Sequence, residues 1–298
     1  MRKTEGREHL VVFEIFSIIV LVGSFSLRIG ESKNVQVLKK DSKIDYSALN
    51  CRKHSALLTD FGGVGDGKTL NTKAFQSAIA NLSQYASEGG AELIVPPGKW
   101  LTGSFNLTSH FTLFLHKGAV ILASQVLMKF ATYSNVVVQG VTILAPVEVP
   151  NTDGINPDSC TNVRIEDVYI VSGDDCIAVK SGWDQYGIKV GMPTQHLIIR
   201  RLTCISPDSA TIALGSEMSG GLQDVRIEDI TAINTESAVR IKTAPGRGGY
   251  IKDIFVRRMT LKNMKYVFWV SGAYKTHPDD GYDPNALAEI KNINYETL

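Results

Sequence analysis

The sequence has little of what several common classes of protein require. Four cysteines in 298 residues are too few for a disulfide-based fold, and their spacings match neither a zinc knuckle nor a redox Cys-x-x-Cys pair. Lys and Arg number 31 against 30 Asp and Glu, so no excess charge attracts nucleic acid or an anionic membrane. A hydrophobic content of 44% excludes disorder. We expect a folded protein with no nucleic acid partner and no structural zinc.

The N-terminal part of the chain reads as a secretory leader. Basic residues within the first nine positions precede a mostly apolar stretch at 10–27, which is shorter than the ~20 apolar residues of a spanning helix. We expect a signal peptide over 1–30, a polar linker over 31–55 and one domain over 56–298. No small-x-small cleavage site stands out, so an uncleaved signal anchor is the main alternative, and only this alternative would place the chain at a membrane.

Two short sequons agree with secretion. Asn81-Leu-Ser and Asn106-Leu-Thr would be glycosylated in a secreted chain. An oxidising compartment would also permit a disulfide. We therefore expect an extracellular protein.

From residue 135 the sequence repeats itself without helical periodicity. Each copy opens with a polar residue, alternates apolar and polar residues, and continues into a second β-branched stretch. The copies start at Asn135, Asn162, His196, Asp224 and Asp253. Such units cannot bury an apolar face alone and must stack, which predicts an all-β fold, a single-stranded right-handed parallel β-helix. A β-sandwich is less favoured because hairpin turns such as Asn-Gly are absent. A short helix is expected before the repeats, over 71–84.

Aligning the copies by their apolar positions places candidate site residues side by side. Ile155, Ile177, Ile212 and Val239 should form one inward-facing ladder. Neighbouring strands lie about 4.8 Å apart, so Asp153 should lie beside Asp175, with Asp174 adjacent.

Three clustered carboxylates beside two cations have a specific chemical use. Like charges at close range raise a carboxyl pKa, which gives a proton donor beside an ionised base, as glycosidic cleavage requires. Arg240 and Lys242 project from a following strand and suit the carboxylate of an anionic sugar. A solvated loop and a calcium site are the other interpretations of the aspartates, and the two cations favour the sugar over calcium.

Three ordered motifs carry a family resemblance. Asn151-Thr-Asp-Gly, Gly173-Asp-Asp and Arg240-Ile-Lys resemble the signatures of plant polygalacturonases, glycoside hydrolase family 28, over residues 56–298. The resemblance implies hydrolysis of α-1,4 galacturonosyl linkages in pectin with inversion. It implies that Asp174 is the general acid, that Asp153 and Asp175 activate water, and that Arg240 and Lys242 hold the substrate carboxylate.

The same resemblance implies further properties. Cys176 would form a disulfide with Cys204. No metal and no organic cofactor are implied, the partner would be pectin or an oligogalacturonide, and the place of action would be the cell wall. We expect a monomer.

The chain also departs from the family pattern. The histidine of the Gly-His-Gly motif is missing, since Ser209-Ala210-Thr211 stands in its place, and the chain is shorter internally and at its C-terminal end. Two alternatives therefore stay open. The protein either binds polygalacturonate without cleaving it, or is a calcium-dependent β-helix lyase that releases an unsaturated product.

Overall fold

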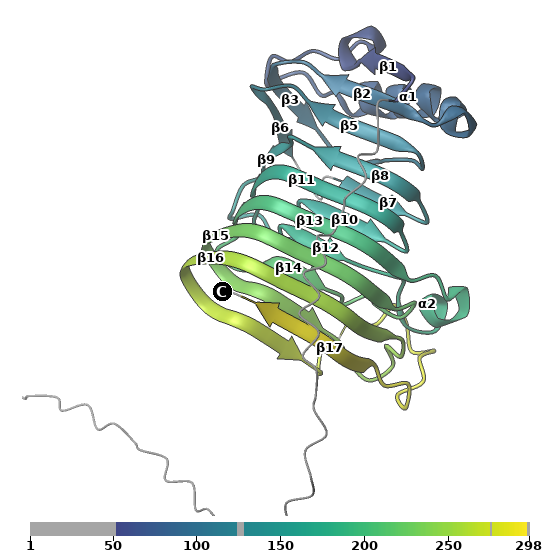
Figure 1. Ribbon diagram of the computed structural model, residues 1–298, viewed down its shortest axis with the longest axis vertical. Coiled ribbons are helices and arrows are strands. Elements are labelled where there is room, and N and C mark those ends of the chain that lie inside the picture. The colour runs from purple at the N-terminus through teal and green to yellow at the C-terminus, as the bar shows by residue number, and fades with distance from the viewer. Residues whose placement is uncertain (1–51, 124–127, 275, 297–298) are drawn as a thin grey trace, which may run out of the picture. The chain divides into compact units, whose positions relative to one another are not determined.

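The computed structural model describes residues 52–123, 128–274 and 276–296. They form a right-handed parallel β-helix whose coils stack along one long axis (Figure 1). The pairing of the long strands is parallel throughout, as between β11 (Thr161–Val171), β13 (Thr194–Ile205) and β15 (Leu222–Lys242). The expected fold is confirmed. The leader at 1–30, and the linker at 31–55 up to residue 51, lie outside the described residues.

The strands form three parallel stacks. The first runs the whole length of the helix: β1 (His54–Leu57), β2 (Ala91–Val95), β5 (Phe111–Leu115), β8 (Ser134–Gln139), then β11, β13, β15, β16 (Tyr250–Ser271) and β17 (Glu289–Glu296). The second contains β3 (Gly98–Thr102), β6 (Ala119–Ala123) and β9 (Thr142–Leu144), and continues into the later parts of β11, β13, β15 and β16. The third contains β4 (Phe105–Asn106), β7 (Met128–Ala131), β10 (Ile155–Asp158), β12 (Ile177–Val179) and β14 (Ala210–Leu214), and continues into the ends of β15 and β16.

Short helices stand outside the stacks. The α-helices are α1 (Thr72–Leu82) and α2 (Asp184–Val190), and the 3-10 helices are η1 (Leu58–Phe61) and η2 (Ser83–Glu88). Helix α1 confirms the helical pattern expected at 71–84, and its Phe75 ring stacks on Phe105 at 4.4 Å, which covers the first coils. Helix α2 was not expected, and it occupies the longest interval between repeats. No helix among the described residues is long and apolar enough to cross a membrane.

The core is built from the ladder that the repeats predicted. Ile155 pairs with Ile177, Ile177 with Ile212 and Ile212 with Val239, and all four side chains are buried. The opening residues of the five copies all adopt the left-handed backbone conformation, with φ between 49° and 57°: Asn135, Asn162, His196, Asp224 and Asp253. Asn and Asp tolerate this conformation better than most residues, which explains why four of the five copies open with one of them.

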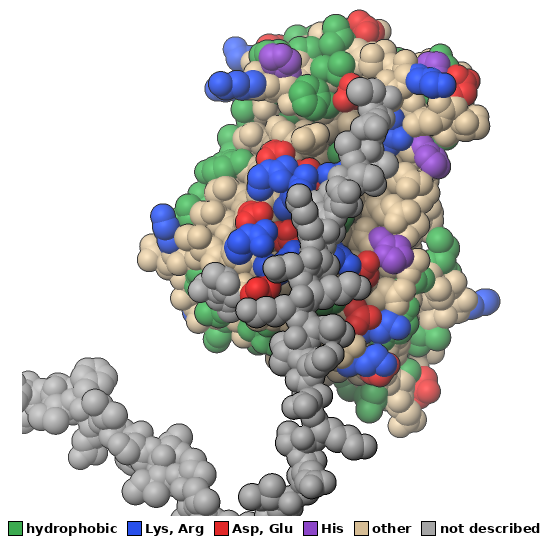
Figure 2. All heavy atoms as spheres, viewed as in Figure 1, with side chains coloured by type: hydrophobic (Ala, Val, Ile, Leu, Met, Phe, Trp, Pro, Cys, Tyr) green, Lys and Arg blue, Asp and Glu red, His purple; other side chains and the backbone are tan. Residues whose placement is uncertain are grey.

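Charged side chains alternate along one outer face of the stack. At one register position, successive strands place Glu166, Arg200, Glu228, Arg257 and Glu296 next to one another. Glu228 is buried and accepts hydrogen bonds from Arg257 and Arg258. Acidic and basic side chains are seen to alternate on this side of the molecule in Figure 2. Because opposite charges face each other on neighbouring coils, this ladder supports the stacking.

The last coils are covered unevenly. β17 pairs with residues 250–257 of β16, while the remainder of β16 has no outer neighbour among the described strands. Tyr266, Phe268 and Val270 are 39–47% exposed on that part of β16. The apolar ladder therefore reaches the surface at Phe268, the partner of Val239.

The charge ladder gives the first prediction. Glu228→Ala should lower the free energy of unfolding by about 1–3 kcal/mol, because it removes a buried carboxylate that faces two guanidinium groups. The matched control is Glu289→Ala, which removes an exposed ion pair with Lys291 and should cost less than about 1 kcal/mol. Equal costs for the two variants in urea unfolding would contradict a stabilising role for the ladder.

Candidate active site

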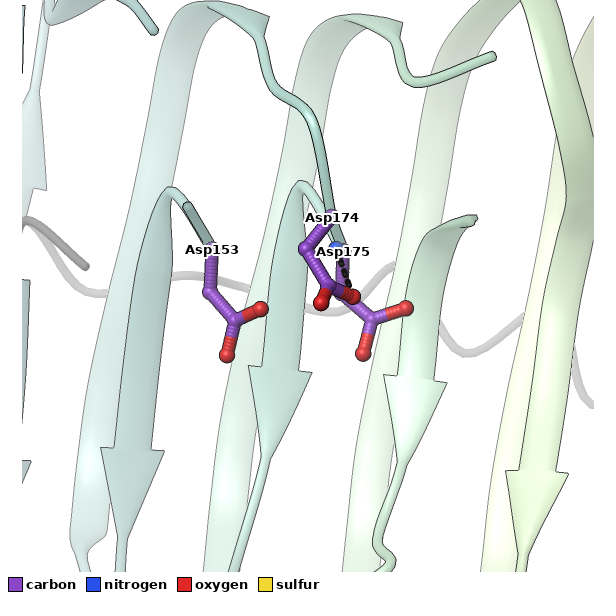
Figure 3. Close-up of side chains that lie close together, drawn as sticks. All are labelled: Asp153, Asp174 and Asp175. Carbon is purple, nitrogen blue, oxygen red and sulfur yellow. Dashed lines mark hydrogen bonds between the residues drawn. The ribbon is translucent and has the colours of Figure 1, made fainter. Parts of the chain in front are cut away.

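Two neighbouring coils bring the three predicted aspartates together. Asp153 lies just before β10, and Asp174 and Asp175 lie just before β12. One carboxylate oxygen of each residue lies within 4.8 Å of those of the other two, and Figure 3 shows the three side chains pointing to the same side of the strands. The coils are held in register by hydrogen bonds from the Gly154 N–H to the Asp175 carbonyl (3.0 Å) and from the Cys176 N–H to the Ala210 carbonyl (2.9 Å). Stacking therefore creates the cluster.

The turn before β12 is held from both sides. A side chain on Gly173 would lie 2.3 Å from the Val149 carbonyl oxygen, so only glycine fits at this position. Directly after Asp175, Cys176 forms a buried disulfide with Cys204 of the next coil. Cys160, the other cysteine among the described residues, is a buried thiol. The disulfide and the close packing at Gly173 together fix the position of Asp174 and Asp175.

Asp175 is surrounded by groups that stabilise its negative charge. Its Oδ2 accepts a hydrogen bond from Lys242 Nζ at 2.5 Å. Its Oδ1 accepts hydrogen bonds from the Ser209 hydroxyl (2.6 Å) and the Ala210 N–H (3.1 Å). Asp175 therefore has an ammonium partner and two further hydrogen-bond donors.

Asp174 accepts hydrogen bonds from neutral groups and, unlike Asp175, none from a lysine among the described residues. Its Oδ1 accepts from the Asp175 N–H at 2.8 Å and from the Ser209 hydroxyl at 3.0 Å, and its Oδ2 accepts from the Asn151 N–H at 3.3 Å. A serine hydroxyl has one hydrogen, so Ser209 can donate fully to only one of the two aspartates. The shorter contact indicates that this aspartate is Asp175.

Asp153 has the least support as an anion. It is buried, and burial together with the charges of Asp175 and Asp174 raises its pKa to about 6. Lys180 and a hydrogen bond from Asn156 (2.8 Å) lower the pKa but do not offset the increase. The raised carboxyl pKa expected from clustering therefore occurs at Asp153.

A cavity of about 210 Å³ lies over the aspartates. Lys242 lines it together with residues that the sequence did not single out, including Lys180, Trp183, Glu217 and Tyr274. Lys180 stands five residues after Asp175 in the same stretch of chain, so its position relative to the Asp pair was an available signal. Glu217 and Tyr274 come from later coils and carry no such signal.

Arg240 is placed differently from Lys242. Its guanidinium carbon lies 3.6 Å from the centre of the Trp269 ring, and its Nη1 lies 3.8 Å from a Glu236 oxygen. Arg240 is not among the residues that line the cavity. The structure thus brings Lys242 to the aspartates and stacks Arg240 on the neighbouring coil.

A buried arginine holds one wall of the cavity. Arg247 is fully buried, forms an ion pair with Asp184 at the start of α2, and donates to the carbonyl oxygens of Ser216 (2.8 Å) and Thr276 (2.5 Å). His277 Nδ1 lies 2.6 Å from the other Asp184 oxygen. Because Ser216 and Thr276 both line the cavity, Arg247 fixes the shape of this wall.

The charge balance favours acid–base chemistry over calcium binding. Calcium requires several oxygen atoms that converge on one point, and three clustered carboxylates could offer them. Here the chain itself supplies positive charge, since Lys242 pairs with Asp175 and Lys180 lies 3.8 Å from Asp153. A cluster in which Lys242 pairs with Asp175 while the pKa of neighbouring Asp153 is raised to about 6 is an arrangement suited to proton transfer.

Asp153 gives a stability prediction. A carboxyl whose pKa is about 6 when folded and 3.8 when unfolded binds more protons in the folded state between these values, so this group destabilises the fold as the pH rises through this window. Asp153→Asn removes that effect and should raise the free energy of unfolding at pH 7 by about 1–3 kcal/mol, with little change at pH 4. The measurement is urea unfolding at both pH values, with exposed Asp208→Asn as the control. A less stable Asp153→Asn protein at pH 7 would contradict the raised pKa.

Known proteins share this architecture and sequence. Residues 113–298 match the model of "Glycosyl hydrolases family 28". The chain is 49% identical to a "Probable polygalacturonase" of Vitis vinifera, over 96% of this chain and 76% of that protein. The matched stretch spans 377 residues although the chain has 298, so the relative contains segments without a counterpart here. "Polygalacturonase-2" of Solanum lycopersicum is 28% identical, over 59% of this chain but only 36% of that protein.

Solved structures show the same fold. A hyperthermoactive exopolygalacturonase of Thermotoga maritima superimposes with a TM-score of 0.54 at 23% identity, covering 76% of this chain and 78% of its own. A family 28 exopolygalacturonase of Yersinia enterocolitica gives a TM-score of 0.52 at 17% identity, covering 83% and 66%. With the coil register and the family match in agreement, the chain belongs to glycosyl hydrolases family 28.

Proposed function

We propose that this protein hydrolyses α-1,4 galacturonosyl linkages in pectin. The observation that carries the proposal is the cluster of Asp153, Asp174 and Asp175 in one cavity, with Lys242 bound to Asp175. Membership of the family and the names of the plant relatives support the substrate. The proposal rests on the site because a fold alone does not determine a reaction.

The three aspartates have different roles in this mechanism. Asp174 protonates the oxygen of the leaving sugar, and Asp153 and Asp175 orient and deprotonate the attacking water. The contacts of Asp175 and Asp174 fit these roles, since Lys242 pairs with Asp175 and Asp174 has no cation within ion-pair distance among the described residues. Asp153 can act as a base only above about pH 6, because its pKa is raised to about 6. No metal and no organic cofactor take part in the proposed reaction.

Two cations are proposed to bind the substrate carboxylate. Lys242 uses one of its three N–H donors on Asp175, which leaves two that can turn toward the cavity. Arg240 is kept in place by its stacking on Trp269 and lies two residues before Lys242 on the same strand. An acidic sugar beside the cleaved bond satisfies both groups.

The proposal includes action outside the cell by a single chain. The Cys176–Cys204 disulfide is typical of an oxidising compartment, and the side chains of Asn81 and Asn106 are exposed and accessible to glycosylation. All three aspartates and Lys242 come from one chain, so a monomer has a complete site. The cell wall, where pectin lies, is the proposed location.

Replacing the proposed acid tests hydrolysis. Asp174→Asn should reduce the release of reducing sugars from polygalacturonate by about 10²-fold or more, since general acid catalysis contributes roughly that much. Exposed Asp208→Asn should leave the rate unchanged. Equal rates for the Asp174→Asn protein and the unmodified protein would show that the mechanism is wrong. An ultraviolet-absorbing unsaturated product would identify a lyase instead.

The configuration of the first product tests inversion. The carboxylate oxygens lie within 4.8 Å of one another, closer than the ~6.5–9.5 Å between two carboxyls typical of inverting glycosidases. A water shared by Asp153 and Asp175 explains inversion at this spacing, because neither carboxylate then acts as the nucleophile. Proton NMR of early hydrolysis should show the β-anomer of the new reducing end. Initial formation of the α-anomer would instead indicate a covalent intermediate.

A further inference from the structure

Lys180 and Glu217 form an ion pair in the cavity that the proposed mechanism does not use. Lys180 follows β12 and Glu217 follows β14, so the pair joins neighbouring coils. Lys180 Nζ lies 3.4 Å from Glu217 Oε1, and the two side chains are 20% and 26% exposed. Placing an ion pair on the wall of a cavity costs free energy, because both charges lose much of their hydration there. Such a pair therefore points to a role in the site.

Asp153 is the aspartate of the cluster that lies near this ion pair. Lys180 Nζ lies 3.8 Å from Asp153 Oδ2, which is too far for a hydrogen bond but close enough for a strong charge interaction. Among the described residues, no other Lys or Arg nitrogen lies within 4.0 Å of an Asp153 oxygen. The short hydrogen bond to Asp153 comes from the neutral amide of Asn156.

The negative charges of the two proposed water-activating residues, Asp175 and Asp153, are therefore stabilised by different numbers of nearby donors and cations. Asp175 has Lys242 at 2.5 Å together with the Ser209 hydroxyl and the Ala210 N–H. Asp153 has an ammonium group at 3.8 Å that it shares with Glu217. One lysine thus forms a direct hydrogen bond with Asp175, and the other lies beyond hydrogen-bond distance of Asp153.

The charges around Asp153 act in known directions. Asp175 and Asp174 raise its pKa, while Lys180 and Asn156 lower it. Burial alone would lower the pKa of Lys180, but Glu217 and Asp153 outweigh burial and raise it, so the ammonium group stays charged. Glu217 attracts the same ammonium group, so Asp153 shares Lys180 with a second carboxylate.

We propose, on the basis of the proposed function, that Lys180 is a positioning residue that keeps Asp153 ionised for water activation, and that Glu217 limits this effect. The pair then sets the pH below which Asp153 takes up a proton and the enzyme loses its base. Lys180 acts through Asp153 and takes no part in bond breaking.

Opposite shifts from the two members of the pair test this inference. Lys180→Met should move the acidic limb of kcat/KM on polygalacturonate to higher pH by about one unit, because an opposite charge within ~4–6 Å lowers a carboxyl pKa by roughly 1–3 units. Glu217→Gln should move the limb to lower pH, since Lys180 is then free to approach Asp153. Lys180→Arg keeps the charge and should leave the acidic limb close to that of the unmodified protein, and exposed Lys189→Met should leave the limb unchanged.

A direct titration separates this inference from the proposed function. Carbon-13 NMR of labelled aspartate carboxyls gives the pH midpoint of the Asp153 titration without any substrate. The Asp153 signal is assigned by its loss in Asp153→Asn. The midpoint should rise in Lys180→Met and fall in Glu217→Gln even if the protein cleaves no pectic polymer, an outcome that would overturn only the proposed function.

Specific outcomes would overturn the inference. An Asp153 midpoint that changes by less than about 0.2 units in both variants would do so. A raised KM for Lys180→Met with an unchanged acidic limb would instead assign Lys180 to substrate contact and would also overturn it. If Lys180→Met does not fold, Glu217→Gln carries the test, and a midpoint that does not fall contradicts the inference.

Discussion

Parallel backbone pairing between neighbouring coils is the constraint on which the site depends. Each coil places its equivalent residues about 4.8 Å from those of the next, so a residue's neighbours are set by register and not by proximity along the chain. The Ile155, Ile177, Ile212 and Val239 ladder fixes that register from the inside. Asp153 then lies beside Asp175 on the outer side. A slip of one residue would turn every side chain to the opposite face and would disperse both the core and the carboxylates.

Within this register, the site differentiates three chemically identical side chains by their donors. Asp175 has an ammonium group, a hydroxyl and a backbone N–H; Asp174 has backbone N–H groups and a share of the Ser209 hydroxyl; Asp153 has one amide and a distant ammonium group. The pKa of Asp153 rises accordingly to about 6. Ser209 stands within the motif where the family's histidine is missing, and its hydroxyl links the two aspartates of the turn. Ser209 and Ala210 thus both donate hydrogen bonds to Asp175 from the next coil.

The fold and the proximity of the three aspartates could both be predicted from the sequence, because both follow from the repeat. Polar left-handed residues at the start of each copy and the inward isoleucines are local signals that recur, so the register could be predicted before any coordinates. Lys180 and Glu217 could not be paired in this way, because Glu217 lies in an irregular connection after β14. Arg240 was expected to lie with Lys242 beside the aspartates. Its stacking on Trp269 depends on a side chain of the following coil, which the alternation of residues within one strand does not reveal.

The charge of the cavity has a consequence for binding an acidic sugar. Asp153, Asp174, Asp175 and Glu217 contribute up to four negative charges, whereas Lys180 and Lys242 contribute two positive charges. A bound galacturonate adds another negative charge, which makes ionisation of the least supported carboxyls still less favourable and so promotes uptake of a proton by the cluster. The same substrate charge opposes ionisation of Asp153, and a cation on the Asp153 side of the cluster, where Lys180 lies, is what offsets that effect.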